Sequence, residues 1–163
     1  MDALQSARAA YRAGRLHDAL EAAQVACERR PKDPDAWRLL GAVSRHVGMP
    51  AAGEDAFRRA AALSPRSHPA PVRVDSERFR ELTDKAAAAL SKDAKGRLEQ
   101  VVAVEVRDLP GTEEIARGVA PDALSVRARE PDNTLVLFQG NLENRARDER
   151  ELATLIAHTL QRA

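Results

Sequence analysis

The sequence predicts an α+β protein in which most residues are helical. Three observations support this fold class. Residues of the same kind recur 34 positions apart early in the chain, apolar residues at helical spacing mark further helices, and two short valine- and leucine-rich stretches in the second half resemble β-strands. We expect helical hairpins over residues 1–65, a proline-rich linker over residues 66–76 and a small α+β domain over residues 77–163.

The repeat in the first 65 residues predicts four helices. The recurring pairs are Gly14 and Gly48, Ala26 and Ala60, and Pro31 and Pro65. A glycine with positive φ often ends a helix, and proline cannot continue one. The expected helices lie near residues 2–13, 16–30, 34–47 and 50–64.

The second copy of the repeat carries a recognisable set of residues. They are Trp37, Leu40, Gly41, Gly53, Phe57, Ala60 and Pro65. Their spacing resembles that of tetratricopeptide repeats, with Ser44 in place of the usual tyrosine and with a weaker first copy, as a terminal repeat allows. The residue pattern requires small residues where the helices of one hairpin touch, and Ala7, Gly41 and Gly53 meet that need. A generic four-helix bundle is the alternative interpretation.

The resemblance implies that the hairpins bind a protein or peptide segment on a concave face. The first helix of each hairpin offers arginines for such a face, namely Arg8, Arg12, Arg38 and Arg45. Some tetratricopeptide domains clamp a terminal carboxylate with Lys, Arg and Asn, but these helices hold no asparagine. Ordinary surface arginines are the commoner case, so no clamp is predicted. Two repeats are fewer than the ~3 usually needed for stability, so the hairpins should pack on a following helix, the second domain or another copy.

The remainder of the chain predicts alternating helices and strands. We expect first a helix capped by Ser76 and ending near Leu90, a turn over 93–97 and a half-buried strand over 101–106. A short helix started by Glu113 and Glu114 and a short strand SVRAR follow. The chain then continues with a strand LVLFQ over 135–139, a loop GNLENRAR and a final helix from about Asp148.

This order over residues 77–163 resembles the small zincin-like metallopeptidase family. The matching segments are FRELTDKAAAAL, VAVEV, LVLFQGNLE and ERELATLIAHTL. The resemblance implies an H-E-x-x-H motif on the last helix, whose histidines would hold zinc and whose glutamate would act as general base.

That motif is missing from this sequence. In one alignment His158 replaces the first ligand, and Thr159 and Arg162 replace the glutamate and second histidine; in the other, Arg162 and Ala163 occupy the first histidine and glutamate. Helix geometry favours the second alignment, because His158 falls on the outer, polar side of the final helix. We therefore predict no catalytic residue, no metal ligand beyond His158 as a remnant, and no cofactor.

Composition excludes several classes of partner. The 26 basic and 25 acidic residues give a net charge of +1, and aromatic residues make up 3%, so neither a basic surface nor stacking platforms for nucleic acid are expected. No segment approaches the ~18 apolar residues of a membrane span, and the N-terminus lacks the apolar stretch of a signal peptide. The single cysteine, Cys27, should be a buried apolar residue. We expect a cytoplasmic protein without membrane insertion.

The predicted function is that of a non-enzymatic adaptor or scaffold. In this hypothesis the hairpins bind a protein segment, and a catalytically dead second domain supports them or adds a second surface. One alternative is a zinc metallopeptidase, or a regulator of one, whose site is completed by another subunit or by a C-terminal extension. Another alternative is a homo-oligomeric structural scaffold in which the short repeats stack between copies.

Overall fold

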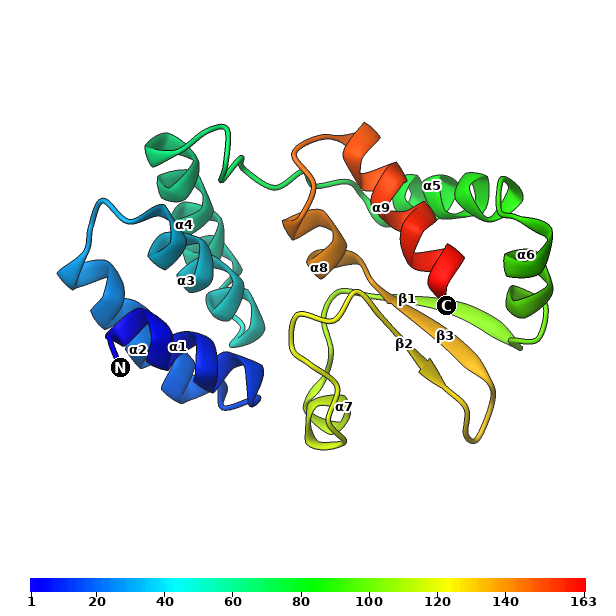
Figure 1. The fold of residues 1–163 in the computed structure, drawn as a ribbon, viewed down its shortest axis with the longest axis horizontal. Helices are drawn as coiled ribbons and strands as arrows, with labels where there is room; N and C mark the ends of the chain where they lie inside the picture. The colour runs from blue at the N-terminus through cyan, green and yellow to red at the C-terminus, as the bar shows by residue number, and fades with distance from the viewer. The chain divides into compact units, whose positions relative to one another are not determined.

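The computed structural model describes residues Met1–Ala163 and shows an α+β protein that is mostly helical (Figure 1). Contacts divide the chain into two compact units. The first comprises Met1–Ala70 and Gly111–Pro121, and the second comprises Pro71–Pro110 and Asp122–Ala163. The division after Ala70 falls inside the predicted linker. The segment Gly111–Pro121, predicted to belong to the C-terminal domain, groups with the hairpins.

Residues Met1–Ala70 of the first unit form two helical hairpins. The predicted helices are confirmed, with bounds α1 Ala3–Arg12, α2 Leu16–Arg29, α3 Pro34–His46 and α4 Pro50–Leu63. Gly14 and Gly48 connect the helices of each hairpin, and both have φ of +78°. The identical backbone angle at equivalent positions explains why glycine recurs there, since other residues adopt this conformation at a cost of about 1 kcal/mol.

Small residues let the helices of each hairpin approach closely. In the first hairpin, Ala7 and Ala19 are completely buried. In the second, a Cβ atom added at Gly53 would lie 2.9 Å from the carbonyl oxygen of Gly41, and one added at Gly41 would lie 2.9 Å from the Phe57 ring. The glycines therefore allow backbone-to-backbone contact between α3 and α4.

The short helix predicted at Glu113 and Glu114 is present as α7, Thr112–Ala116. Gly111 precedes it, and the Glu114 side chain accepts a hydrogen bond from the Gly111 N–H. Within the first unit, Ile115 of α7 lies against Gly14, so the turn between α1 and α2 has no room for a side chain.

The second unit is a three-stranded sheet with helices packed on one face (Figure 1). The central strand β3 runs parallel to β1 and antiparallel to β2. The core is formed by α5, α9 and the side chains of Leu135 and Leu137 in β3. The elements are α5 Ser76–Ala88, α6 Lys92–Leu98, β1 Ala103–Arg107, β2 Ser125–Ala128, β3 Thr134–Phe138, α8 Gln139–Asn144 and α9 Glu149–Arg162.

Several local predictions for the second unit are wrong. Asp75, not Ser76, caps α5, because its carboxylate accepts the Arg78 N–H. The expected turn over 93–97 is helix α6, which Ser91 caps through the N–H of Ala94. The expected loop after β3 contains helix α8. In the first two cases a polar residue earlier in the chain satisfies the free N–H groups of a helix start.

The two strands with apolar sequences have opposite surroundings. β3 is central, and Leu135 to Phe138 are buried, so the LVLFQ segment is an inner strand and has no edge available for a partner. β1 was expected to be half-buried, but all five of its residues are exposed. Its position at the edge of the sheet explains the difference, since the sheet order is β1-β3-β2.

The segment that enters the second unit is hydrogen-bonded to α8 and to the residues that follow it. The N–H of Val72 donates to the carbonyl of Ala146 (2.8 Å), and the N–H of Val74 donates to Oε2 of Glu143 (2.8 Å). Oε1 of Glu143 lies 3.6 Å from Nη1 of Arg73, and the Glu143 side chain is 4% exposed. A buried carboxylate thus holds an extended segment that belongs to neither a helix nor a strand.

No helix in the structure combines the length and the apolar character required to cross a bilayer.

Candidate functional site

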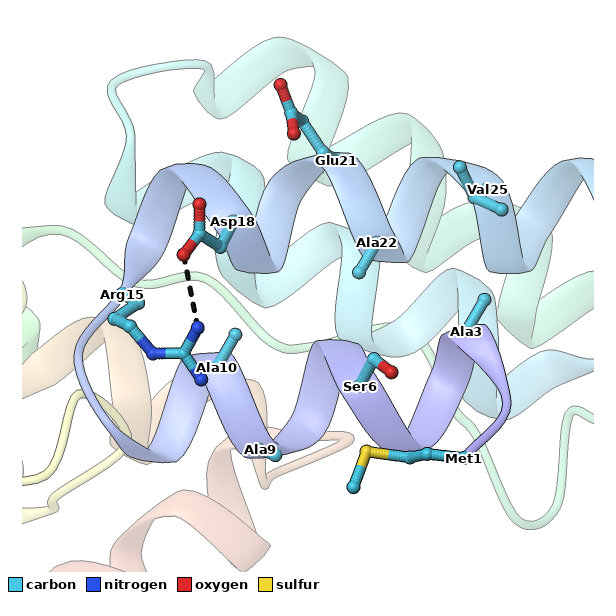
Figure 2. Close-up of a pocket in the computed structure, with 10 residues that line it drawn as sticks. All are labelled: Met1, Ala3, Ser6, Ala9, Ala10, Arg15, Asp18, Glu21, Ala22 and Val25. Atoms are coloured by element: carbon cyan, nitrogen blue, oxygen red, sulfur yellow. Dashed lines mark hydrogen bonds and ion pairs between the residues drawn. The ribbon is translucent and has the colours of Figure 1, made fainter.

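The outer face of the first hairpin carries a groove between α1 and α2 (Figure 2). Its volume is about 600 Å³, and its floor is made of small side chains. Ala3 and Ala10 of α1 point toward α2, and Ala22 of α2 points toward α1 (Figure 2). The groove is wide because residues of this size fill little of the space between two helices.

The second hairpin has a surface equivalent to this groove. The residues of α3 that lie 34 positions after Ala3, Ser6 and Ala9 are Trp37, Leu40 and Val43. Trp37 and Leu40 pack in a cluster with Ala26 and Cys27 of α2, and Val43 packs in a cluster with Ala19 of α2. The second hairpin therefore uses this surface to receive a helix, α2. The first hairpin has the same surface with smaller side chains.

The rim of the groove on the α2 side carries charge. Asp18 and Glu21 are exposed acidic residues there. Arg15 forms an ion pair with Asp18 at 3.1 Å, in which both side chains are more than half exposed (Figure 2). Such an exposed pair contributes little to stability, so these side chains are available to contact a ligand.

The four arginines predicted as a binding face do not line this groove. Arg8 pairs with Asp35 (3.3 Å), and Arg45 pairs with Glu54 (2.9 Å) with a side chain only 13% exposed. Arg12 is exposed, and Arg38 is partly buried. Arg45 thus serves the packing of α3 on α4. Sequence reasoning missed the groove, although the replacement of three large residues by Ala3, Ser6 and Ala9 was its visible signal.

A polar cluster joins three segments of the first unit. Oδ1 of Asp35 lies 2.6 Å from Nε2 of His68, and Oδ2 lies 3.3 Å from Nη2 of Arg8. The hydrogen bond from His68 and the positive charge of Arg8 lower the pKa of the Asp35 carboxyl below its usual value. The cluster ties the segment after α4 to the start of α3 and to α1.

We predict that this cluster makes the first unit sensitive to acid. A carboxyl whose pKa is lower in the folded than in the unfolded state stabilises the fold above its unfolded pKa, and this contribution is lost as pH falls through the folded pKa. Asp35→Asn should therefore lower the melting temperature at pH 7, and the difference between the two melting temperatures should shrink once the pH falls below the ordinary pKa of an aspartate. Thermal melts followed by circular dichroism from pH 7 to pH 3 measure this, with the exposed Asp84→Asn as control. A constant gap between wild type and Asp35→Asn at all pH values would contradict the assignment.

Cys27 is a structural residue in this geometry. Its side chain is 4% exposed, and it belongs to the cluster formed with Trp37 and Leu40. Burial and the nearby charge of Asp33 raise the pKa of the Cys27 thiol to about 11. The thiolate is the reactive form of cysteine, so Cys27 is protonated and unreactive at neutral pH.

The final helix does not provide the residues that zinc requires. His158 is exposed and lines a groove of about 440 Å³ together with Arg145 and Arg162. Thr159 donates its hydroxyl to the carbonyl of Leu155 (2.8 Å), and Ala163 has no donor atom in its side chain. No three His, Cys, Asp or Glu side chains are grouped so that they could hold a metal ion. A cationic arginine at a ligand position does not fit zinc under either alignment.

Comparison of the chain with protein-family models, with curated proteins and with solved structures gave no match.

Proposed function

We propose that this protein is a non-enzymatic adaptor that binds an amphipathic helix of another protein in the groove between α1 and α2. The observation that carries the proposal is the equivalence of this groove to the surface of the second hairpin on which α2 packs. A surface that receives a helix in one repeat is suited to receive one in the other. The repeat spacing and its resemblance to tetratricopeptide proteins support the same interpretation.

The groove also indicates the chemistry of its ligand. Because Ala3, Ser6 and Ala9 stand where the second hairpin has Trp37, Leu40 and Val43, the incoming helix must bring the large apolar side chains itself. Helix-in-groove recognition of this kind uses apolar anchors at i, i+3, i+4 and i+7. The acidic rim formed by Asp18 and Glu21 favours basic residues beside those anchors.

For the second unit we propose a non-catalytic zincin-like domain that supports the hairpins. The order of its elements and the matching segments support the resemblance, and Thr159, Arg162 and Ala163 at the positions of the motif support the loss of catalysis.

The adaptor proposal is tested by blocking the groove with one side chain. Ala22→Arg should weaken binding of a partner by at least about tenfold, which corresponds to ~1.4 kcal/mol, because the guanidinium would occupy the space meant for an apolar anchor. Gln24→Arg is the matched control: it adds the same group to the same helix at an exposed position that does not line the groove. Its affinity should stay within about twofold of wild type.

The experiment proceeds in two steps. Proteins captured by the wild type but not by Ala22→Arg are identified by quantitative mass spectrometry. The helix they share is then synthesised and titrated calorimetrically against the wild type and both variants. If no captured protein depends on Ala22, or if Gln24→Arg weakens binding equally, the groove is not the binding site.

A further inference from the structure

The edge strand β1 has an unusual surface for a sheet edge. On the face that it shares with Leu135 and Leu137 it carries Val104 and Val106, and each is 38% exposed, while Val102 just before the strand is 75% exposed. The helices α5 and α9 cover the central strand but leave this row of valines accessible. An exposed apolar edge strand readily pairs with another strand.

The backbone of β1 is directed to allow such pairing. In β3 the N–H of Phe138 donates to the carbonyl of Leu124 (2.9 Å), so the even-numbered residues of β3 direct their backbone groups to the β2 side. The odd-numbered residues, Leu135 and Leu137, therefore bond to β1. In a parallel ladder with the observed register, this leaves the backbone groups of Val104 and Val106 pointing away from β3, toward the open edge. Val102, just before the strand, differs, because its N–H donates to the carbonyl of Asn133 on the β3 side (2.7 Å).

The usual protection against edge pairing is weak here. Natural sheets protect their edges with net charge, proline or bulges. The charged residues of β1 neutralise each other, since Oε2 of Glu105 lies 3.1 Å from Nη2 of Arg107. The strand contains no proline.

We propose that β1 pairs antiparallel with β1 of a second copy of this chain, so that two three-stranded sheets join into one. The charges select the register. Pairing centred on Glu105 would place two carboxylates directly opposite each other, which is destabilising. Pairing centred on Val104 places Val104 opposite the Val104 of the second copy and Ala103 opposite Glu105. The ladder ends before Val102, whose N–H is bonded to Asn133. This register buries Val104 and opposes no like charges.

The symmetric pair has a consequence for binding. A two-fold interface uses the same strand on both copies, and it brings two grooves into one assembly, which would raise the avidity for a partner with two helices. The pairing itself does not depend on the proposed function of the groove, because the groove residues lie in the first unit and β1 lies in the second.

The test compares two lysine substitutions at neighbouring exposed positions. Val104→Lys would place two ammonium groups opposite each other at the two-fold axis and should convert the dimer to a monomer. Ala103→Lys adds the same charge, but opposite Glu105 of the second copy, so it should leave the dimer intact or tighten it. Sedimentation velocity over a hundredfold range of protein concentration measures the oligomeric state, and circular dichroism verifies that both variants are folded.

Each outcome decides the proposal. A dimer for the wild type and for Ala103→Lys, together with a folded monomer for Val104→Lys, supports it. A wild type that is monomeric at every concentration overturns the proposal. In that case an extended segment of another protein would be the alternative partner for the edge of β1. Dimers in both variants, or monomers in both, also overturn it, because they exclude pairing in this register. Titration of the groove with its helix is a separate measurement and can succeed or fail independently.

Discussion

Gly53→Val should destabilise the first unit by about 3 kcal/mol, at the upper end of what overpacking a helix contact costs. A Cβ atom at this position would lie 2.9 Å from the carbonyl oxygen of Gly41 and 2.8 Å from Cγ of Arg45. The oxygen belongs to a helix backbone and cannot move aside as a flexible side chain would. The helices α3 and α4 would have to separate, which also loosens the packing of Phe57 against Gly41.

Urea unfolding followed by tryptophan fluorescence measures this effect. Trp37 is the only tryptophan and lies in α3, so its emission reports the first unit alone. Ala52→Val is the control, because it adds the same branched side chain to an exposed position next to Gly53 in α4. It should change the free energy of unfolding by less than about 0.5 kcal/mol. Equal effects of the two variants would show that the close approach of α3 and α4 is not what requires glycine.

Glu143→Ala should destabilise the second unit by roughly 2–4 kcal/mol, as expected when one partner of a buried charged network is removed. The Glu143 carboxylate accepts the N–H of Val74 and lies beside the Arg73 guanidinium, and its side chain is 4% exposed. Without it, the Val74 N–H loses its partner and the entering segment loses one of its attachments to α8. Hydrogen exchange should show reduced protection over residues 71–75, and thermal melts should show the loss of stability.

The chain offers a matched control for Glu143. Glu149 also joins a distant arginine, with Oε1 accepting a hydrogen bond from Nε of Arg78 at 2.7 Å. Its side chain is 44% exposed, and exposed ion pairs contribute little because water screens them. Glu149→Ala should therefore have a much smaller effect than Glu143→Ala. If both variants lose the same stability, burial is not what gives Glu143 its importance.

The hairpins could be predicted from sequence because local chemistry determines them. Gly14 and Gly48 require a backbone conformation that few residues adopt, and Pro31 and Pro65 cannot continue a helix. Each of these glycines and prolines determines the backbone conformation within a few residues of its own position. The four helix bounds consequently agree with the structure to within about two residues.

The second unit could be predicted only in part, because its environment depends on distant pairing. The alternation in VVAVEV indicates a strand, but whether that strand is central or at an edge depends on β3, about 30 positions later. The role of Glu143 depends on Val74, 69 positions earlier. Neither relationship leaves a trace in the local pattern of residues.

The candidate site was missed for a different reason. The sequence predicts a binding face at Arg8, Arg12, Arg38 and Arg45, because charged side chains attract a ligand. The groove instead arises from the small side chains of Ala3, Ser6 and Ala9. Small residues at the end of a repeat array are equally expected of a solvent-exposed cap, so only the geometry of α1 and α2 distinguishes a groove from a flat surface.

The packing of α5 against α9 has a consequence during synthesis of the chain. The two hairpins of the first unit are closed by turns of a few residues, so each can form soon after its second helix leaves the ribosome. In contrast, α5 packs on a helix about 70 residues later, as the 71 positions between Arg78 and Glu149 illustrate. The side chains of Phe79 and Leu82 therefore remain exposed to water until α9 has been synthesised. The nascent chain therefore passes through a period in which the four hairpin helices can already be folded, while α5 presents an apolar face and neither α7 nor α9 has been made.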